Sequence, residues 1–261
     1  MVNDMSTISF FLNRRLLAIL FLWLAFPLAS FAEEPEEDAV AKSILEKSDE
    51  IRFPSEGFQV DISISSSVPG QEMENRKYRV LSKGNENTVV MILEPASERG
   101  QIMLMKGHDL WVFMPNVSQP IRLGLAQRLT GEVSNGDLAR ANFVGDYTPR
   151  LVRQEKIDGE EHHVLELMAV DRGVTYHRVV LWVNKANYRP HKAEFYSLSN
   201  RLMKTCSYEN FQVMAGKRRP TRLVMEDALK PGERSIMEYG QMKLRDLPDK
   251  VFSKDYLKKL Q

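Results

Sequence analysis

Five histidines are the residues of this sequence most suited to acid–base or metal chemistry, and their spacing favours neither. They are His108, His162, His163, His177 and His191. On a strand the adjacent pair His162 and His163 would point to opposite faces. The chain contains neither the HExxH nor the CxxC spacing of common metal sites. We therefore expect no metal ion and no cofactor, and we interpret the histidines as scattered polar surface residues.

Candidate nucleophiles are equally scarce. The sequence has no GxSxG elbow and no glycine-rich phosphate loop. Its single cysteine, Cys206, cannot form an internal disulfide and is interpreted as a small buried residue. Asp137 and Asp146 could serve as acid and base in an enzyme acting on an envelope lipid, although each fits a helix cap or a turn equally well. We predict no catalytic site and leave that enzyme as an alternative.

Apolar side chains carry a stronger signal than the polar ones. Several segments are apolar at consecutive positions, so that a strand there would be apolar on both faces, and the chain has 13 methionines, which suit surfaces that accept ligands of variable shape. A core packed on both sides and a ligand cavity on one side both explain this pattern. The segments are Met91 and Leu93, Ile102 to Met105, Leu110 to Met114, and Val179 to Val183 with Trp182.

The elements that must position these residues are mostly strands. Asp38 can cap a helix that runs to about Arg52, and Phe58, Val60, Ile62 and Ile64 then alternate with polar residues as in a half-buried strand. Turn signals separate similar segments along the rest of the chain, which predicts about eleven antiparallel strands. A sheet of this width must curl, because twist accumulates from strand to strand. A curled sheet has a concave face that could hold a ligand.

The strand pattern is interrupted between Leu125 and Asp146. Ala126 to Leu129 and Asp137 to Asn142 are predicted as short helices bracketed by glycines. We expect this glycine-rich insertion to be a helical lid over the concave face, with Leu125, Leu129, Leu138 and Phe143 as its apolar contacts.

The N-terminus indicates export from the cytoplasm. Arg14 and Arg15 precede a 14-residue apolar run that ends at Ala29, and Ser30 and Ala32 give a signal-peptidase site. A membrane span is the alternative, but a span needs about 20 apolar residues. We expect residues 1–32 to be a signal peptide and residues 33–261 to form a single soluble periplasmic domain. Removing the peptide lowers the formal net charge from +1 to zero, so nucleic acid is not an expected partner.

Four segments between Leu110 and Tyr147 resemble a known family. They read LWVFMP, QPIRLG, QRLTGEVSNGDLAR and NFVGDY, with Pro115, Arg122 and Asp146-Tyr147-Thr148 in corresponding places. They are similar to outer-membrane lipoprotein-sorting proteins, the relatives of the carrier LolA and the receptor LolB. The resemblance implies a mainly β (α+β) fold, a half-open antiparallel barrel closed by helices, whose apolar concave face shelters acyl chains.

The function implied is a periplasmic carrier that binds acyl chains of a lipid or lipoprotein and helps to move it toward the outer membrane. The candidate protein partners are an inner-membrane transporter and an outer-membrane acceptor. A periplasmic sensor or partner-binding module that detects lipid-like signals is an alternative, because the same fold occurs in such regulators. The side chains expected to line the apolar cavity are Met91, Leu93, Met103, Met105, Trp111, Phe113 and Trp182.

Strand alternation divides the segment 109–114 between two faces. Trp111 and Phe113 share one face, and Leu110, Val112 and Met114 share the other. We expect the aromatic pair to line the concave pocket, because large rings can contact an acyl chain along its length. The aliphatic set is then expected to pack beneath the cover.

The export signal gives the first testable prediction. Cell fractionation should recover the protein in the soluble periplasmic fraction, and N-terminal sequencing should start at Glu33, because cleavage after Ala32 fits the small residues at the site. An intact N-terminus retained in the membrane would contradict the predicted compartment.

Overall fold

The computed structural model describes residues 38–257. The predicted signal peptide, residues 1–32, and its cleavage site lie outside the described residues. Within the described part, no helix is both long enough and apolar enough to span a membrane.

Helix α1 (Ala39–Arg52) begins where the sequence predicts. The carboxylate of Asp38 accepts hydrogen bonds from the backbone N–H groups of Val40 and Ala41, both at 3.0 Å, which satisfies amides that the helix itself leaves without partners. Ile44 and Leu45 lie on the buried side of the helix. The predicted cap and helix are therefore confirmed.

One antiparallel sheet of fourteen strands forms most of the described chain. Its order is β6-β5-β4-β3-β2-β1-β15-β14-β13-β12-β11-β10-β9, and β16 pairs with β1 outside this path. The end strands β6 and β9 do not pair with each other, so the sheet is not closed among the described residues. Its strands are β1 (Phe58–Ser67), β2 (Glu74–Lys83), β3 (Asn87–Glu94), β4 (Ile102–Lys106), β5 (Asp109–Phe113), β6 (Ile121–Leu123), β9 (Tyr147–Ile157), β10 (Glu160–Ala169), β11 (Arg178–Asn184), β12 (Pro190–Tyr196), β13 (Leu202–Met214), β14 (Lys217–Asp227), β15 (Arg234–Tyr239) and β16 (Lys243–Leu244).

The predicted fold class is confirmed in its coarse features and corrected in its strand count. The fold is mainly β, with an antiparallel half-open sheet and few helices. The described residues contain sixteen strands where about eleven were expected. Strands of two residues, such as β16, are too short to show a periodic pattern in the sequence.

The insertion is less helical than predicted. Residues 126–129 do not form a helix; β7 (Arg128–Thr130) and β8 (Val133–Ser134) form a hairpin instead, with Gly131 in the left-handed region at its turn. Helix α2 (Asn135–Ala139) follows and is shorter than expected. A capping box between Ser134 and Asp137 explains why the helix begins there.

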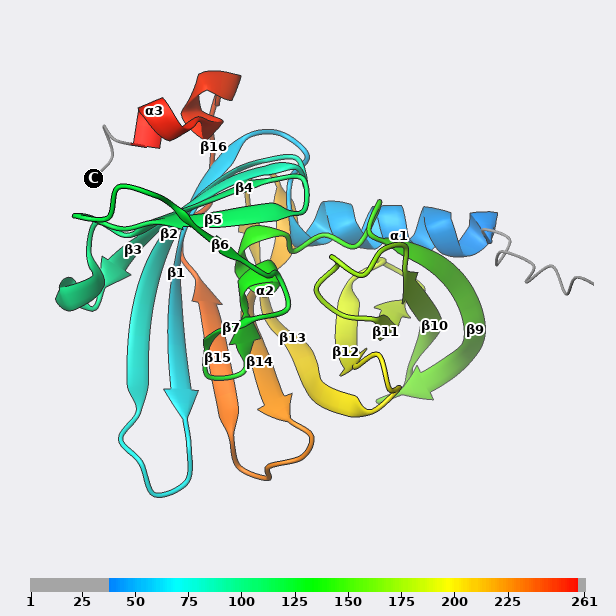
Figure 1. The fold of residues 1–261 in the computed structure, drawn as a ribbon. Helices are drawn as coiled ribbons and strands as arrows, with labels where there is room; N and C mark the ends of the chain where they lie inside the picture. The colour runs from blue at the N-terminus through cyan, green and yellow to red at the C-terminus, as the bar shows by residue number, and fades with distance from the viewer. Residues whose placement is uncertain (1–37, 258–261) are drawn as a thin grey trace, which may run out of the picture. The chain divides into compact units, whose positions relative to one another are not determined.

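Side chains alternate between two differently covered faces of the sheet. The concave face carries the main hydrophobic core, which includes residues of α1, the insertion and most strands. On the opposite face, the C-terminal elements η2 (Asp249–Phe252) and α3 (Lys254–Leu257) cover β3 and β4. Figure 1 shows the strands from β13 to β9 curving away from β1, β2 and β15, with α2 and β7 on the concave side.

The two ends of the sheet differ in the length of their turns. The strand register places the short turns, such as 107–108, 158–159 and 215–216, at one end. The other end, which we name the long-turn rim, is formed by residues 68–73, 95–101, 114–120, 170–177, 197–201 and 228–233. This rim also exposes large apolar side chains, among them Met73, Leu198 and Leu229.

Candidate functional site

The concave face is closed by the insertion in this structure. Two enclosed cavities of about 20 Å³ each remain between the sheet, α1 and α2. A cavity of about 10–15 Å³ is enough for one water molecule, so each of these holds about one water and no larger ligand. Any apolar ligand must displace part of the insertion to reach the deep core.

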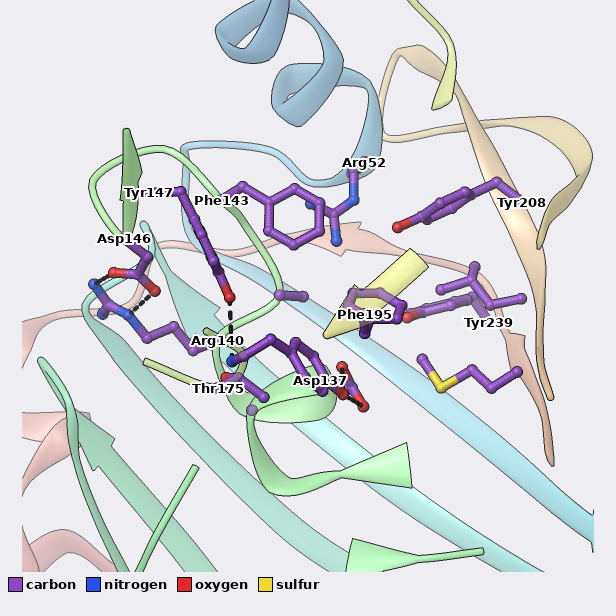
Figure 2. A pocket seen from close by; sticks show the side chains of 15 residues that line it. Arg52, Asp137, Arg140, Phe143, Asp146, Tyr147, Thr175, Phe195, Tyr208 and Tyr239 are labelled. Atoms are coloured by element: carbon purple, nitrogen blue, oxygen red, sulfur yellow. Dashed lines mark hydrogen bonds and ion pairs between the residues drawn. The ribbon is translucent and has the colours of Figure 1, made fainter. Parts of the chain in front are cut away.

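Aromatic side chains surround the first enclosed cavity (Figure 2). The guanidinium of Arg52, at the end of α1, lies 4.0 Å from the ring centre of Phe143 in the insertion. Tyr208 and Tyr239 come from β13 and β15 and are buried, which raises the pKa of both hydroxyls. These hydroxyls therefore remain protonated at neutral pH.

A carboxylate of α1 holds the C-terminal end of the insertion. Asp49, which is 4% exposed, accepts hydrogen bonds from the backbone N–H groups of Phe143 and Val144 at 2.7 and 2.8 Å. Arg52 pairs with the same carboxylate at 2.9 Å. Buried charges are costly unless they are paired and hydrogen-bonded, so this contact strongly favours the closed position of residues 143–144.

A second ion pair lies at the short-turn end. Arg140 contacts both carboxylate oxygens of Asp146 at 2.6 Å, and both side chains are 3% exposed. Figure 2 shows this two-pronged contact. The guanidinium also donates to the carbonyl oxygens of Asn85 and Gly107 in two turns of the sheet. Arg140 therefore joins the insertion to these turns.

A third buried group joins α2 to the far half of the sheet. Lys204 of β13 pairs with Asp137 at 3.0 Å and donates to the carbonyl oxygen of Glu132. The hydroxyl of Tyr176 donates to the same carboxylate at 2.7 Å. Asp137 thus has a cation and a hydroxyl as partners, which compensates for its burial.

Two glycines allow the insertion to approach its surroundings closely. A Cβ added at Gly131 would lie 2.2 Å from the hydroxyl oxygens of Ser66 and Ser235, and one at Gly136 would lie 1.9 Å from Oγ1 of Thr175. Neither distance is sterically possible for a real side chain. These positions therefore require glycine, which explains part of the glycine content that the sequence shows here.

Residues 124–130 are held much less firmly than residues 131–146. Their backbone hydrogen bonds stay within the insertion, for example from Asn135 to the carbonyl of Gln127 and from Gly136 to that of Leu125. The side-chain hydrogen bond that leads to the sheet runs from Thr130 to Glu74 of β2 at 3.1 Å. Apolar packing of Leu125 and Leu129 supplies the rest of their attachment.

Two open hollows flank this segment at the long-turn rim. The first, which we name the β2–β5 hollow, has a volume of about 400 Å³, and the second, the β11–β13 hollow, about 300 Å³. Gln127, Arg128 and Leu129 line the first, and Ala126 lines the second. The other residues around the β2–β5 hollow are Arg76, Tyr78, Ile92, Glu98, Gln101, Met103, Val112, Leu123 and Asn135.

The residues predicted to line a cavity are divided between the two faces. Met103 and Met105 belong to the concave core. Met91 and Phe113 pack on the opposite face, beneath the C-terminal elements. Trp111 is paired with Leu104 on that same face. Leu93 is half-buried at an irregularity in the pairing of β2 with β3, where strand alternation does not assign it to a face. Trp182 lies in a separate cluster with Val164 and Val180.

The predicted orientation of the 109–114 strand is therefore wrong. Leu110 and Val112 belong to or pack against the concave core, whereas Phe113 packs beneath η2 and α3. Alternation separates the two faces of a strand but does not identify them. The reason for the reversal is the C-terminal segment, which covers the aromatic face with Val251 and Phe252.

The four predicted lid residues all belong to the concave core or pack against it, and their role as a lid stays a prediction. Leu125, Leu138 and Phe143 are buried in the concave core, and Leu129 packs against it. Sequence reasoning missed Tyr78, Ile92 and Val112, which the structure places around the β2–β5 hollow. The signal that could have identified them is the alternation of residues 58–64. Its apolar positions lie on the concave face, and following the strand pairing from β1 to β5 gives the residues on the same face.

The polar candidates are less scattered than predicted. His162 is 2% exposed, and its ring lies 4.9 Å from that of His191, so the surface interpretation is wrong for His162. His108 contacts Asp146 at 2.9 Å, and Asp146 and Asp137 are engaged in the buried ion pairs described above. Cys206 is buried as predicted, and burial raises the pKa of its thiol to about 12.

One group of carboxylates could hold a cation. Oxygens of Glu132, Asp227 and Glu233 lie within 4.8 Å of one another. Arg128 lies 3.7 Å from Glu132, and Lys230 lies 3.3 Å from Glu233, so basic side chains of the protein already supply counter-charge. The expectation of no bound metal stays a prediction.

Comparisons with known proteins identify the family. A family model described only as an uncharacterized protein matches residues 84–259. The crystal structure of the LolA superfamily protein NE2245 from Nitrosomonas europaea is 65% identical in sequence, with a TM-score of 0.80, and the match covers 83% of this chain and 98% of that one. The chain belongs to the LolA superfamily.

Two more distant structures share the fold. A putative outer-membrane lipoprotein-sorting protein domain from Vibrio parahaemolyticus has a TM-score of 0.72, and a DUF1329 family protein from Desulfovibrio piger has one of 0.73. Each is 21% identical, and each match covers 84% of this chain and 98% of the other. No curated protein sequence matches the chain.

The buried pair of Lys204 and Asp137 gives the second testable prediction. Replacing Lys204 with Met should lower the free energy of unfolding by about 3 kcal/mol, because it leaves the buried Asp137 carboxylate without its cation. Adding Asp137→Asn should recover part of this loss, since the amide is uncharged. Urea unfolding of the single and double variants measures both effects. Additive losses in the double variant would show that the two side chains are not coupled.

Proposed function

We propose that this protein is a periplasmic carrier that binds acyl chains of a lipid or lipoprotein on its concave face and helps to move them toward the outer membrane. The observation that carries the proposal is a continuous apolar face shared by both halves of the sheet. The weakly held residues 124–130 cover part of this face, and the β2–β5 hollow opens beside them. Membership of the LolA superfamily agrees with it. The Vibrio parahaemolyticus domain, a putative outer-membrane lipoprotein-sorting protein, supports the same class of cargo.

The energetics of such a carrier require no catalytic group. Each methylene removed from water contributes about 0.8 kcal/mol, so ten sheltered methylenes offset about 8 kcal/mol of exposure. Closed in this structure, the concave core already buries the side chains of the insertion. In this proposal a cargo chain enters the β2–β5 hollow and replaces Leu125 and Leu129 on the sheet.

The moving part of the cover in this proposal is residues 124–130 rather than the whole insertion. Residues 131–146 are fixed by the ion pairs of Asp137, Arg140 and Asp49, whereas residues 124–130 are attached mainly by apolar packing. Apolar contacts to these residues can be exchanged for contacts to an acyl chain at little net cost. Residues 1–32 act in this proposal as the signal peptide, and residues 33–261 form the single carrier domain. An inner-membrane transporter and an outer-membrane acceptor complete the proposed route.

The third prediction tests which face of the sheet binds the chain. Val112→Trp should weaken binding of a fluorescent acyl probe at least tenfold, because the added ring fills the β2–β5 hollow. Phe113→Trp is the matched control: it is the next residue of the same strand but lies on the opposite face, beneath the C-terminal elements. Probe titration and thermal melts of both variants would check the prediction. Equal binding by both variants, or loss only in Phe113→Trp, would contradict a concave binding face.

The fourth prediction concerns the cover. In hydrogen exchange followed by mass spectrometry, peptides from residues 124–130 should exchange faster than those from residues 136–147, because buried ion pairs hold the second segment. An added acyl ligand should change the exchange of residues 124–130 most. Uniform exchange across the insertion, unchanged by ligand, would rule out this segment as the moving part.

A further inference from the structure

Tyr78 of β2 carries a buried hydroxyl without a hydrogen-bond partner among the described residues. The side chain is 0% exposed, and burial raises the pKa of its hydroxyl to about 12. Buried polar groups in native proteins are hydrogen-bonded with few exceptions, and an exception calls for an explanation. Tyr78 also lines the β2–β5 hollow, next to Arg76 and Met103.

None of the other unpartnered buried atoms of the described chain belongs to a residue that lines the β2–β5 hollow or the β11–β13 hollow. They belong to Ser48, Arg52, Asn142 and His163. Arg52 and Asn142 line the two enclosed cavities of about 20 Å³, which are too small for a ligand. A volume of about 400 Å³ falls within the usual range of small-molecule sites, so Tyr78 differs from these residues in its surroundings.

The charges around the β2–β5 hollow are already paired within the protein. The guanidinium of Arg76 contacts Glu74 at 2.7 Å and Glu98 at 2.6 Å. Arg128 lies 3.7 Å from Glu132. Arg76 lies close enough to Tyr78 to act against the effect of burial on the pKa of its hydroxyl. Arginine can donate hydrogen bonds but cannot accept them, so the hydroxyl proton of Tyr78 is still without an acceptor. The hollow therefore offers the hydroxyl of Tyr78 as a hydrogen-bond donor. Both of its arginines are already paired with carboxylates.

The floor of the hollow is apolar. Ile92, Met103 and Val112 come from three neighbouring strands, and Leu129 of the movable segment lies above them. Tyr78 lines the same hollow as this floor and as Leu129 of the segment proposed above to move. A ligand that matches this arrangement has a hydrocarbon chain attached to an uncharged hydrogen-bond acceptor.

We propose that the β2–β5 hollow binds an acyl chain through its uncharged ester or amide carbonyl, which accepts a hydrogen bond from the hydroxyl of Tyr78. The inference rests on the proposed carrier function and specifies the chemical class of its cargo. The chain lies over Met103 and Val112 in place of Leu129. A free carboxylate binds more weakly, because its charge loses water without gaining a free cation.

The experiment compares two probes of equal chain length, 1-monopalmitoylglycerol and palmitate, by calorimetric titration at monomeric concentrations and neutral pH. Wild type should bind the ester more tightly. Tyr78→Phe should weaken ester binding about five-fold, the size of one lost hydrogen bond, and leave palmitate binding unchanged. The melting temperature of the ligand-free variant should equal or exceed that of wild type, because the substitution removes a hydroxyl that has no partner.

Tyr176→Phe is the matched control. Its hydroxyl donates to Asp137 at 2.7 Å in the enclosed cavity, so this variant should melt at a lower temperature and keep the preference for the ester. Equal ester binding by Tyr78→Phe and wild type, or failure of Tyr78→Phe to fold, would overturn the inference while wild-type binding still supports a carrier. Absence of binding of either probe to wild type would instead overturn the carrier function and the inference with it.

Discussion

A wide curled sheet must cover its concave apolar face, and the rest of this structure follows from how that face is covered. Helix α1 covers part of it, and the insertion after β6 covers the rest. The insertion buries backbone amides and charged side chains, which need hydrogen-bond partners or counter-charges. Asp49, Arg140 and Lys204 supply them, each in a place where water is excluded. Because an unpaired buried charge is so costly, these contacts fix residues 131–146 of the insertion in one position.

The insertion is attached more firmly at one end than at the other, so the two ends differ in how easily they open. Buried ion pairs hold residues 131–146, whereas packing of Leu125 and Leu129 holds most of residues 124–130. Ion pairs are specific to one geometry, while apolar contacts accept any apolar surface. Opening at the long-turn rim therefore needs less free energy than opening at the short-turn end. The two hollows lie on either side of the weakly held segment, where an incoming chain first meets the apolar face.

Much of the fold could be predicted from local patterns, and the site only in part. The cap at Asp38, the antiparallel strands and the buried Cys206 follow from residue type and periodicity, whereas the half-open form of the sheet is implied by the family resemblance. The face of Trp111 and Phe113 could not be predicted, because it depends on the C-terminal segment, more than 130 residues away in the sequence. The buried ion pair of Lys204 with Asp137 joins residues 67 positions apart, and no local pattern reveals such a pair.

The same distinction explains why the polar residues of this site differ in role. Asp137 and Asp146 looked suited to acid and base chemistry, yet each is already bound by a buried cation and acts to hold the cover. Tyr78 carries no such signal in the sequence, but it is the hydroxyl left without a partner beside the β2–β5 hollow in the described chain. Groups whose bonds are complete stabilise the closed state. A ligand can supply the hydrogen bond that the hydroxyl of Tyr78 lacks. Because Tyr78 belongs to strand β2 and not to the insertion, it stays in place when the insertion moves.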